Sequence, residues 1–529
     1  MKSRLLLCAL LIALTTSLSA QQPTAVPLPP MGWSSWNSFS NIVDSENVMA
    51  QAKAMASNGM QKAGYQYINI DEGWWLGERH PDGSFVIDPK AWPALAPGEK
   101  PGDMANIVRY IHSLGLKAGI YTDAGKDGCS MYPDLGPKYF HTGSEGHYDQ
   151  DFLQFARWGF DYVKVDWCGG DKENLDPATQ YAEIAKAIAR AEAITGHHLY
   201  FSICEWGKNS PWTWAPNIGG SPADIWRTSG DIVAPIVAGH EHADRKVDFP
   251  KMLSNFDQGI HPEAQHTGFF NDPDMMVLGM PGLSDEQNRL HMSLWAISGA
   301  PLLVGADLTT LTPTSLATLT NPAVVAIDQD PLALQAVKIA SPAEGIEVWS
   351  KFIAPSGHRA VLLLNRTKQE ANISVQWSAL GLDASRPVKV KDLWSGKELT
   401  ATQDGYSAQA PAGDFAFLLV SGTETKPTHY TPAVSKVEKD AQVFANVTSN
   451  FEIAPVEITY TNPEPSTRFI NLRVNEQTTT RVALPSTKTG KGHVWVQVLL
   501  DHGNKGNQLV FSNPCACGGK PGIETIAVQ

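Results

Sequence analysis

The chain has 529 residues, a formal net charge of −13 at pH 7 and six cysteines. Its charged residues are spread along the chain without blocks of like charge. This composition argues against nucleic acid and anionic membranes as partners, and it supports only solubility. Beyond the N-terminal segment, no stretch reaches the apolar length that a membrane span needs.

The N-terminal segment has the pattern of a secretory signal peptide. Lys2 and Arg4 precede the apolar run from Leu5 to Leu14, and the small residues Ser17 and Ser19 stand where cleavage is expected. The apolar run is too short to span a membrane. We therefore predict a signal peptide over residues 1–20 and a secreted or periplasmic protein without stable membrane insertion.

Strand-like and helical segments alternate over residues 21–332. Eight strands, each followed by a helical segment such as Ser45 to Asn58 or Pro101 to Leu114, predict a TIM-type (βα)8 barrel. A doubly wound open sheet is the alternative, but no Gly-rich phosphate loop follows the first strand. The expected strands are Met31 to Trp33, Tyr67 to Asp71, Lys117 to Tyr121, Tyr162 to Asp166, Tyr200 to Cys204, Ile225 to Thr228, Gly268 to Asn271 and Pro301 to Val304.

Acidic residues stand at the ends of many of these predicted strands. A carboxylate at the end of a buried strand must be hydrogen-bonded, paired or functional. In a TIM-type barrel the catalytic groups lie at the C-terminal ends of the strands. Asp166 closes the fourth strand and Asp231 follows the sixth, and we interpret them as a glycosidase carboxylate pair. Further acids at strand ends are Asp71, Glu72, Asp123, Glu205, Asp272 and Asp274.

After Asp330 the pattern changes to short alternating apolar runs, which are typical of antiparallel β-sandwiches. We predict one sandwich over residues 333–421, a polar linker over 422–432 and a second small β-sandwich over 433–529. The last domain resembles carbohydrate-binding modules only loosely, and an inert structural domain is an equal alternative.

The cysteines allow one prediction from position. Cys168 and Cys204 stand at the ends of consecutive predicted strands, so in an oxidising compartment they are expected to form a disulfide. Two buried free thiols are the alternative. Cys515 and Cys517 lack the spacing and the second ligand pair of a zinc site. No metal site and no cofactor is predicted.

A set of barrel motifs, in this order, resembles glycoside hydrolase family 27, the α-galactosidase or melibiase family. The resemblance covers Pro29 to Ser421, which includes the barrel and the first sandwich. The motifs are Pro30-Met-Gly-Trp-Ser-Ser-Trp36, Asn69-Ile-Asp-Glu-Gly-Trp74, Gly119-Ile-Tyr-Thr-Asp123, Lys164-Val-Asp-Trp-Cys168, Cys204-Glu-Trp206, Trp226-Arg227 with Asp231, and Asn271-Asp-Pro-Asp-Met275.

The resemblance implies a retaining mechanism. Asp166 is expected to attack the anomeric carbon, and Asp231 to protonate the leaving oxygen and then to activate water. Lys164 lies two residues before Asp166 on the same strand, so both side chains share one face and the lysine favours the ionised nucleophile. Asp231 follows Gly230 on a loop, and nearby carboxylates are expected to raise its pKa.

The resemblance also implies a pocket for a terminal sugar. Trp36 is expected to form an apolar wall under the ring, although core packing is the ordinary role of such an aromatic residue. Asp71 is expected to accept hydrogen bonds from hydroxyls at the non-reducing edge. The remaining expected pocket residues are Tyr121, Lys164, Glu205, Arg227 and Asp274.

Two departures from the family matter. At the position of Glu72 the family usually has an aspartate that contacts the C6 hydroxymethyl group of galactose, and Glu72 carries one more methylene into that space. A sugar that lacks C6, such as β-L-arabinopyranose, is expected to fit better, by about 1–3 kcal/mol. The family's cysteine at the position of Gly73 is also missing, and this implies that Cys129 is a free thiol.

The main hypothesis is therefore an exo-acting α-galactosidase, and the alternative is a β-L-arabinopyranosidase. The expected partner is an oligo- or polysaccharide with terminal galactose or arabinopyranose. A carbohydrate-binding protein with an inactive barrel belongs to a different class, and the joint presence of Lys164, Asp166, Arg227 and Asp231 argues against it. The sequence predicts neither the natural aglycone nor the oligomeric state.

Overall fold

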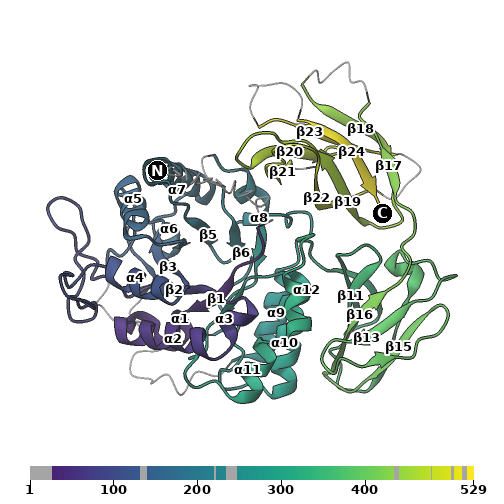
Figure 1. The fold of residues 1–529 in the computed structure, drawn as a ribbon, viewed down its shortest axis with the longest axis horizontal. Coiled ribbons are helices and arrows are strands. Elements are labelled where there is room, and N and C mark those ends of the chain that lie inside the picture. Colours follow the sequence, from purple (N-terminus) through teal and green to yellow (C-terminus); the bar gives the residue numbers. More distant parts are fainter. Residues whose placement is uncertain are drawn as a thin grey trace, which may run out of the picture.

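The structure is a computed structural model that describes residues 27–131, 140–219, 222–233, 247–433, 440–477, 479–501, 506–514 and 521–529. The predicted signal peptide, Cys515 and Cys517 lie outside the described residues. The chain folds into a barrel and two β-sandwiches, which lie side by side in Figure 1. Among the described residues, no helix is both long and apolar enough to cross a membrane.

The first unit is a barrel of eight parallel strands, which follow one another around the ring in chain order. The ring closes where Met276, just after the seventh strand, bridges Val304 of the eighth. The predicted TIM-type barrel is confirmed, and the open doubly wound sheet is excluded. The strands are β1 Met31–Ser34, β2 Tyr67–Ile70, β3 Lys117–Asp123, β4 Tyr162–Asp166, β5 Tyr200–Cys204, β6 Ile225–Arg227, β7 Phe270–Asp272 and β8 Leu302–Val304.

Helices surround the strands, and their ends follow from capping residues. In the longest, the Asp176 carboxylate accepts from the Thr179 N–H, a proline begins the helix, and Gly196 ends it in the left-handed conformation. The helix predicted from Pro101 begins only at Ala105. The α-helices are α1 Trp36–Phe39, α2 Ser45–Ser57, α3 Met60–Ala63, α4 Ala105–Ser113, α5 Tyr148–Trp158, α6 Cys168–Lys172, α7 Pro177–Thr195, α8 Pro211–Trp214, α9 Phe249–Gln258, α10 Asp285–Ser298, α11 Pro313–Leu319 and α12 Pro322–Asp328.

The second unit is an antiparallel sandwich of a six-stranded and a two-stranded sheet. It contacts the helices of the first unit: the Lys351 ammonium donates to the carbonyl of Ile327 on α12 at 2.7 Å. The strands are β9 Val337–Ala343, β10 Ile346–Ile353, β11 His358–Asn365, β12 Ala371–Gln376, β13 Lys389–Asp392, β14 Glu398–Leu399, β15 Gly405–Ala410 and β16 Phe415–Ser421.

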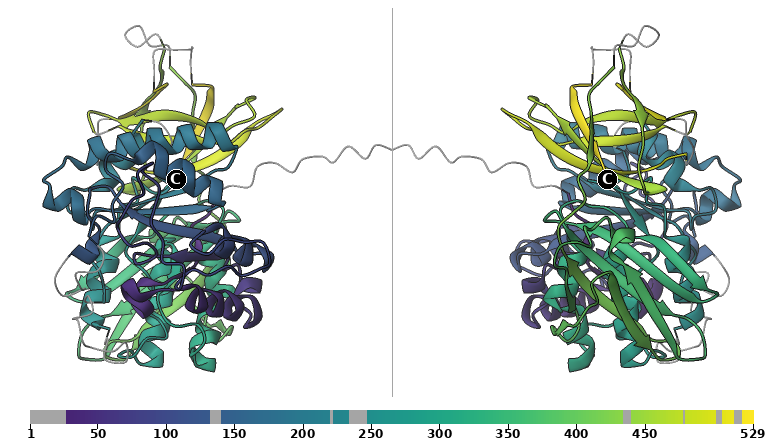
Figure 2. Two further views of the ribbon diagram at one scale, coloured as in Figure 1. Left: turned by 90° about the vertical axis from the view of Figure 1, so that its left-hand side faces the viewer. Right: turned by 90° about the vertical axis from the view of Figure 1, so that its right-hand side faces the viewer.

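The third unit is a sandwich of two four-stranded sheets, which Figure 2 shows above the barrel in yellow and light green. Its first strand lies inside the segment predicted as a linker and pairs with the last strand. The strands are β17 Thr428–Tyr430, β18 Gln442–Val447, β19 Ile453–Tyr460, β20 Arg468–Val474, β21 Thr480–Leu484, β22 Gly492–Leu499, β23 Asn507–Ser512 and β24 Ile523–Val528.

The third unit packs against the barrel near the N-terminal ends of β6 and β7. The Asn217 side chain, which precedes β6, donates to the carbonyl of Thr479 at 2.8 Å. Phe269, just before β7, packs on Phe469 with ring centroids 6.0 Å apart. Catalytic groups of such barrels lie at the opposite, C-terminal ends of the strands. The third unit therefore contacts the barrel away from the expected catalytic end.

Candidate active site

The C-terminal ends of β4 and β6 each carry one of the two predicted catalytic aspartates. Asp166 is the last residue of β4, and Asp231 lies four residues after Arg227, which ends β6. The side chain of Asp166 is 5% exposed, whereas that of Asp231 is 39% exposed. The first carboxylate is thus buried in the barrel mouth, and the second is open to solvent.

Lys164 links Asp166 to a second buried carboxylate, Asp71, which follows β2. Its ammonium nitrogen lies 3.0 Å from Asp71 Oδ2 and 3.5 Å from Asp166 Oδ2. Burial opposes the charge on Lys164, but the two carboxylates outweigh it and hold the lysine pKa well above its usual range. Burial raises the pKa of Asp166, and the Lys164 charge opposes that rise. Lys164 therefore supports the ionised form of Asp166, as predicted.

Arg227 has the corresponding role at β6. One guanidinium nitrogen lies 3.0 Å from Asp231 Oδ1 and the other lies 3.0 Å from Asp274 Oδ1. Asp274 also accepts from the Ile232 N–H at 2.8 Å, so it ties the loop that carries Asp231 to β7. The φ angle of Asp274 is 101°, a backbone conformation that a non-glycine residue adopts at a cost and that is found at functional sites.

Glu72 is directed toward the loop after β3. Its two carboxylate oxygens accept from the Ser130 N–H and the Thr142 hydroxyl, each at 2.9 Å, and the residue is 1% exposed. Burial raises its pKa to about 8, although the hydrogen bond from Thr142 opposes the shift. Glu72 thus anchors this loop.

Three other predicted pocket residues are buried in different surroundings. Tyr121 lies under Lys164, whose ammonium is 5.3 Å from the ring centroid. Trp36 belongs to an apolar cluster with Met275. Glu205 accepts from both the backbone and the side-chain nitrogen of Asn209 at 2.9 Å, and burial raises its pKa to about 7. Trp36 and Tyr121 are also packed as core residues, which is the alternative stated above for Trp36.

Both cysteine predictions are wrong: Cys168 is not bonded to Cys204, and Cys129 is not a free thiol. The disulfide joins Cys129 to Cys168, and Cys204 is a buried free thiol. Cys168 lies two residues beyond the end of β4, at the start of α6, where it meets the loop that follows β3. Cys204 still lies on its strand, and its sulfur accepts from Arg227 Nη1 at 3.6 Å. Strand-like runs alone could not reveal this difference, because Cys168 belongs to α6 and not to its strand.

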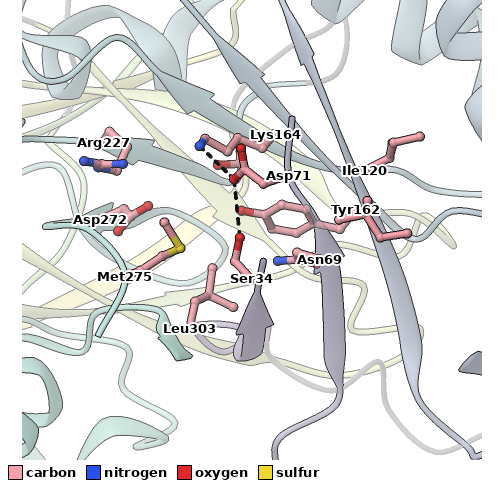
Figure 3. A pocket seen from close by; sticks show the side chains of 12 residues that line it. Ser34, Asn69, Asp71, Ile120, Tyr162, Lys164, Arg227, Asp272, Met275 and Leu303 are labelled. Carbon is pink, nitrogen blue, oxygen red and sulfur yellow. Dashed lines mark hydrogen bonds and ion pairs between the residues drawn. The ribbon is translucent and has the colours of Figure 1, made fainter. Parts of the chain in front are cut away.

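Beneath these charged residues, the barrel interior contains a small cavity of about 20 Å³, room for about one water molecule. Figure 3 shows the side chains that surround it, with Asp71 between Lys164 and Ser34. Sequence reasoning gave no role to Ser34 and Asn69, because the search at strand ends was for acidic residues. The other lining residues are Ile70, Ile120, Tyr162, Ser202, Arg227, Asp272, Met275 and Leu303.

A TIM-type barrel whose catalytic end holds a buried lysine-supported carboxylate and an exposed arginine-bound one has the arrangement of a glycoside hydrolase. A family model described as alpha galactosidase A matches residues 28–330. Models of the α-galactosidase C-terminal β-sandwich domain and of an α-galactosidase CBM13 domain match residues 343–420 and 441–528. The chain belongs to the α-galactosidase family, glycoside hydrolase family 27, and is an enzyme of the melibiase type.

Sequence comparison with relatives from other organisms supports the same family. A probable α-galactosidase of Dictyostelium discoideum is 36% identical over 403 residues, which cover 75% of this chain and 93% of that protein. α-Galactosidase A of Cellvibrio japonicus is 39% identical over 373 residues, which cover 70% of this chain and 84% of that protein. Both are similar to this chain in sequence over the greater part of its length.

Solved structures share the fold. α-Galactosidase I from Mortierella vinacea superposes with a TM-score of 0.64 at 28% identity, over 77% of this chain and 100% of that one. A β-L-arabinopyranosidase from Geobacillus stearothermophilus superposes with a TM-score of 0.62 at 21% identity, over 75% of this chain and 97% of that one. At that identity the second structure shows only that the fold is shared.

Proposed function

We propose that this enzyme is a retaining, exo-acting α-galactosidase in which Asp166 is the nucleophile and Asp231 is the acid/base. The observation that carries the proposal is the contrast between the two aspartates. Asp166 is buried and supported by the Lys164 ammonium, as a nucleophile that must be ionised requires. Asp231 is partly exposed on a loop, where a leaving oxygen and later a water molecule can reach it.

In the first step, Asp166 Oδ2 forms a bond to the anomeric carbon while the bond from that carbon to the leaving oxygen breaks. Asp231 gives its proton to the leaving oxygen. In the second step, water attacks the anomeric carbon, Asp231 takes the water's proton, and the bond to Asp166 breaks. Two inversions give overall retention, and such a pair of carboxyls is expected about 5–5.5 Å apart.

The glycone pocket in this proposal is built from the same charged residues. Asp71, which Lys164 and Ser34 hold in place, accepts hydrogen bonds from sugar hydroxyls. Trp36 offers an apolar wall. The other proposed pocket residues are Tyr121, Glu205, Arg227 and Asp274.

Galactose is the proposed sugar. The orientation of Glu72 toward Ser130 and Thr142 removes the reason for expecting a preference for a sugar without C6, because its carboxylate is already engaged by the loop. The named relatives at 36% and 39% identity are α-galactosidases. Terminal α-galactosides of oligo- or polysaccharides are therefore the proposed substrates, and export through residues 1–20 and sugar binding by the third unit remain predictions.

The proposal is tested with p-nitrophenyl α-D-galactopyranoside and wild-type enzyme, Asp166→Ala and Asp166→Asn. We expect wild-type turnover with α-galactose as the first product in proton NMR, and a loss of kcat on the order of 10⁴-fold or more in both variants. First formation of β-galactose would contradict the retaining mechanism. A higher kcat/KM on p-nitrophenyl β-L-arabinopyranoside would contradict the assignment of the sugar.

A further inference from the structure

A third carboxyl group, Asp123, lies directly beside the proposed nucleophile. Asp123 ends β3 and is the register partner of Asp166 at the end of β4, so both side chains lie on the inner face of the barrel. One carboxylate oxygen of each residue and the two disulfide sulfurs of Cys129 and Cys168 all lie within 4.8 Å of one another. Because the disulfide occupies both sulfurs, these residues do not offer thiolate ligands to a metal ion.

The two oxygens of Asp123 have different surroundings. Oδ1 accepts from the Gly125 N–H at 2.7 Å and the Gly169 N–H at 3.1 Å, and so joins the loop after β3 to the start of α6. Oδ2 is fully buried and accepts no hydrogen bond from any residue that the structure describes. A buried carboxylate oxygen without a donor is costly if the group is ionised, but a protonated oxygen needs only an acceptor.

The charges that act on Asp123 are negative rather than positive. Within the described parts of the chain, it forms no ion pair, and the titratable groups that influence it or are influenced by it are acids and phenols. These are Asp166, Glu72, Tyr121, Tyr148 and Tyr181. Burial first, and then the charge of Asp166, raises the pKa of Asp123 well above its usual range. The ion pairs of Lys164 are with Asp71 and Asp166.

We propose that Asp123 is a positioning residue that remains a neutral acid during turnover and directs its Oδ2 proton toward the carboxylate of Asp166. The neutral acid adds no second negative charge beside the nucleophile, and its O–H dipole stabilises the ionised form of Asp166. Its Oδ1 holds the turn behind Asp166, whose carbonyl accepts from the Ala124 N–H at 2.9 Å. Asp123 is fully buried, so in this proposal it acts through Asp166 and not on the sugar.

The proposal rests on the nucleophilic role of Asp166, so the first test does not involve turnover. A difference infrared spectrum of wild type minus Asp123→Asn, recorded at pH 7, should contain the carbonyl band of a protonated carboxylic acid. Asparagine keeps an oxygen for Gly125 and Gly169 and an N–H donor in place of the acid proton. Carboxylate bands in the difference spectrum, without the acid band, would overturn the proposal whatever the mechanism of the enzyme.

The second test is the acid limb of the pH dependence of kcat/KM, which reports ionisation of the nucleophile. Asp123→Asn should leave this limb within about 0.3 pH units of wild type, and Asp123→Ala should move it to higher pH by about one unit, because Asp166 loses a donor to its charged form. A limb that moves to lower pH in Asp123→Asn would show that Asp123 is ionised. If Asp123→Ala does not fold, Asp123→Val, which also lacks a donor, replaces it. An equal loss of activity at every pH in the alanine or valine variant, without a shift of the limb, would mean that Asp123 is only structural.

Discussion

At the catalytic end of the barrel, buried cations bind the carboxylates, whereas near the N-terminal ends of β6 and β7 a network of neutral amides joins the barrel to the third unit. Lys164 and Arg227 each bind two carboxylates at the catalytic end. Near the other end, Gln335 donates its backbone N–H to the Gln497 side chain of the third unit at 3.1 Å. Buried charges cost more free energy than buried amides, and they persist where chemistry uses them. We therefore expect the charged residues at the catalytic end to serve catalysis, and the amides near the N-terminal ends of β6 and β7 to serve stability.

The amide contacts form a connected network. Gln335 Oε1 accepts from the His261 N–H at 2.7 Å and from Asn271 Nδ2 at 3.3 Å, and Asn271 lies on β7. Asn271 Oδ1 in turn accepts from the indole of Trp226 on β6 at 2.8 Å. Since a satisfied amide network carries no net charge, its loss should lower stability without changing the electrostatics of the catalytic end.

The largest expected effect is on activity at the catalytic end. Asp231→Ala should lower kcat/KM on an unactivated oligosaccharide such as raffinose by about 10²–10⁴-fold, because the leaving oxygen loses its proton donor. The loss on p-nitrophenyl α-D-galactopyranoside should be smaller, since that leaving group needs little protonation. Equal losses on both substrates, measured by initial rates, would contradict the acid role of Asp231.

Arg227→Met should show how much stability is lost when a buried carboxylate at the catalytic end loses its cation. The variant leaves Asp274 buried without its cation, so the free energy of unfolding should fall by about 3–5 kcal/mol, and activity should fall with it. Urea denaturation monitored by tryptophan fluorescence measures the stability. The double variant Arg227→Met with Asp274→Asn is the control, and it should recover part of the lost stability. No recovery would mean that packing rather than charge explains the loss.

Gln497→Met should give the corresponding effect at the opposite end. Methionine has a similar shape but no strong acceptor, so the buried N–H of Gln335 loses its partner, at a cost of about 1–3 kcal/mol. The kcat/KM of the folded variant on the nitrophenyl galactoside should stay within about twofold of wild type. A tenfold loss of activity without a loss of stability would refute the separation of the two ends.

The last prediction concerns Glu72 and depends on pH. Its pKa is raised from 4.5 to about 8, so between these values the unfolded chain releases a proton that the folded protein retains. The stabilisation from this group is complete below about pH 4.5 and is lost as the pH rises to about 8, by up to about 1.4 kcal/mol per pH unit. In Glu72→Gln, stability relative to wild type should therefore rise across this range. Unfolding curves at pH 5, 6 and 7 that stay parallel in the two proteins would contradict the raised pKa.

Sequence patterns predicted the barrel well because strands such as β2, β4 and β5 contain clear apolar runs, and these runs located Asp71 and Asp166 at strand ends. Arg227, Asp231 and Asp274 were brought together as predicted. The partner of Cys168 was not predictable, because it depends on the path of the loop that carries Cys129. The orientation of Glu72 was missed for the same reason, since its partners Ser130 and Thr142 both lie between β3 and α5, as Cys129 does.

The third unit shows the same limit of sequence reasoning. Its strand-like runs predicted a sandwich, but nothing in them indicated that Gln497 reaches the barrel or that β17 lies within the predicted linker. Such contacts depend on the relative placement of whole domains, and local periodicity carries no information about that placement.

The central claim, that Asp166 is the nucleophile of a retaining enzyme, is tested most directly by trapping the covalent intermediate. The enzyme is incubated with a fluorinated galactosyl fluoride that forms the glycosyl-enzyme but hydrolyses slowly, then digested and analysed by mass spectrometry. We predict one added fluorogalactosyl group per chain, on the peptide that contains Asp166, and none in Asp166→Ala. A label on another residue, or no label while the wild-type enzyme is active, would contradict the account.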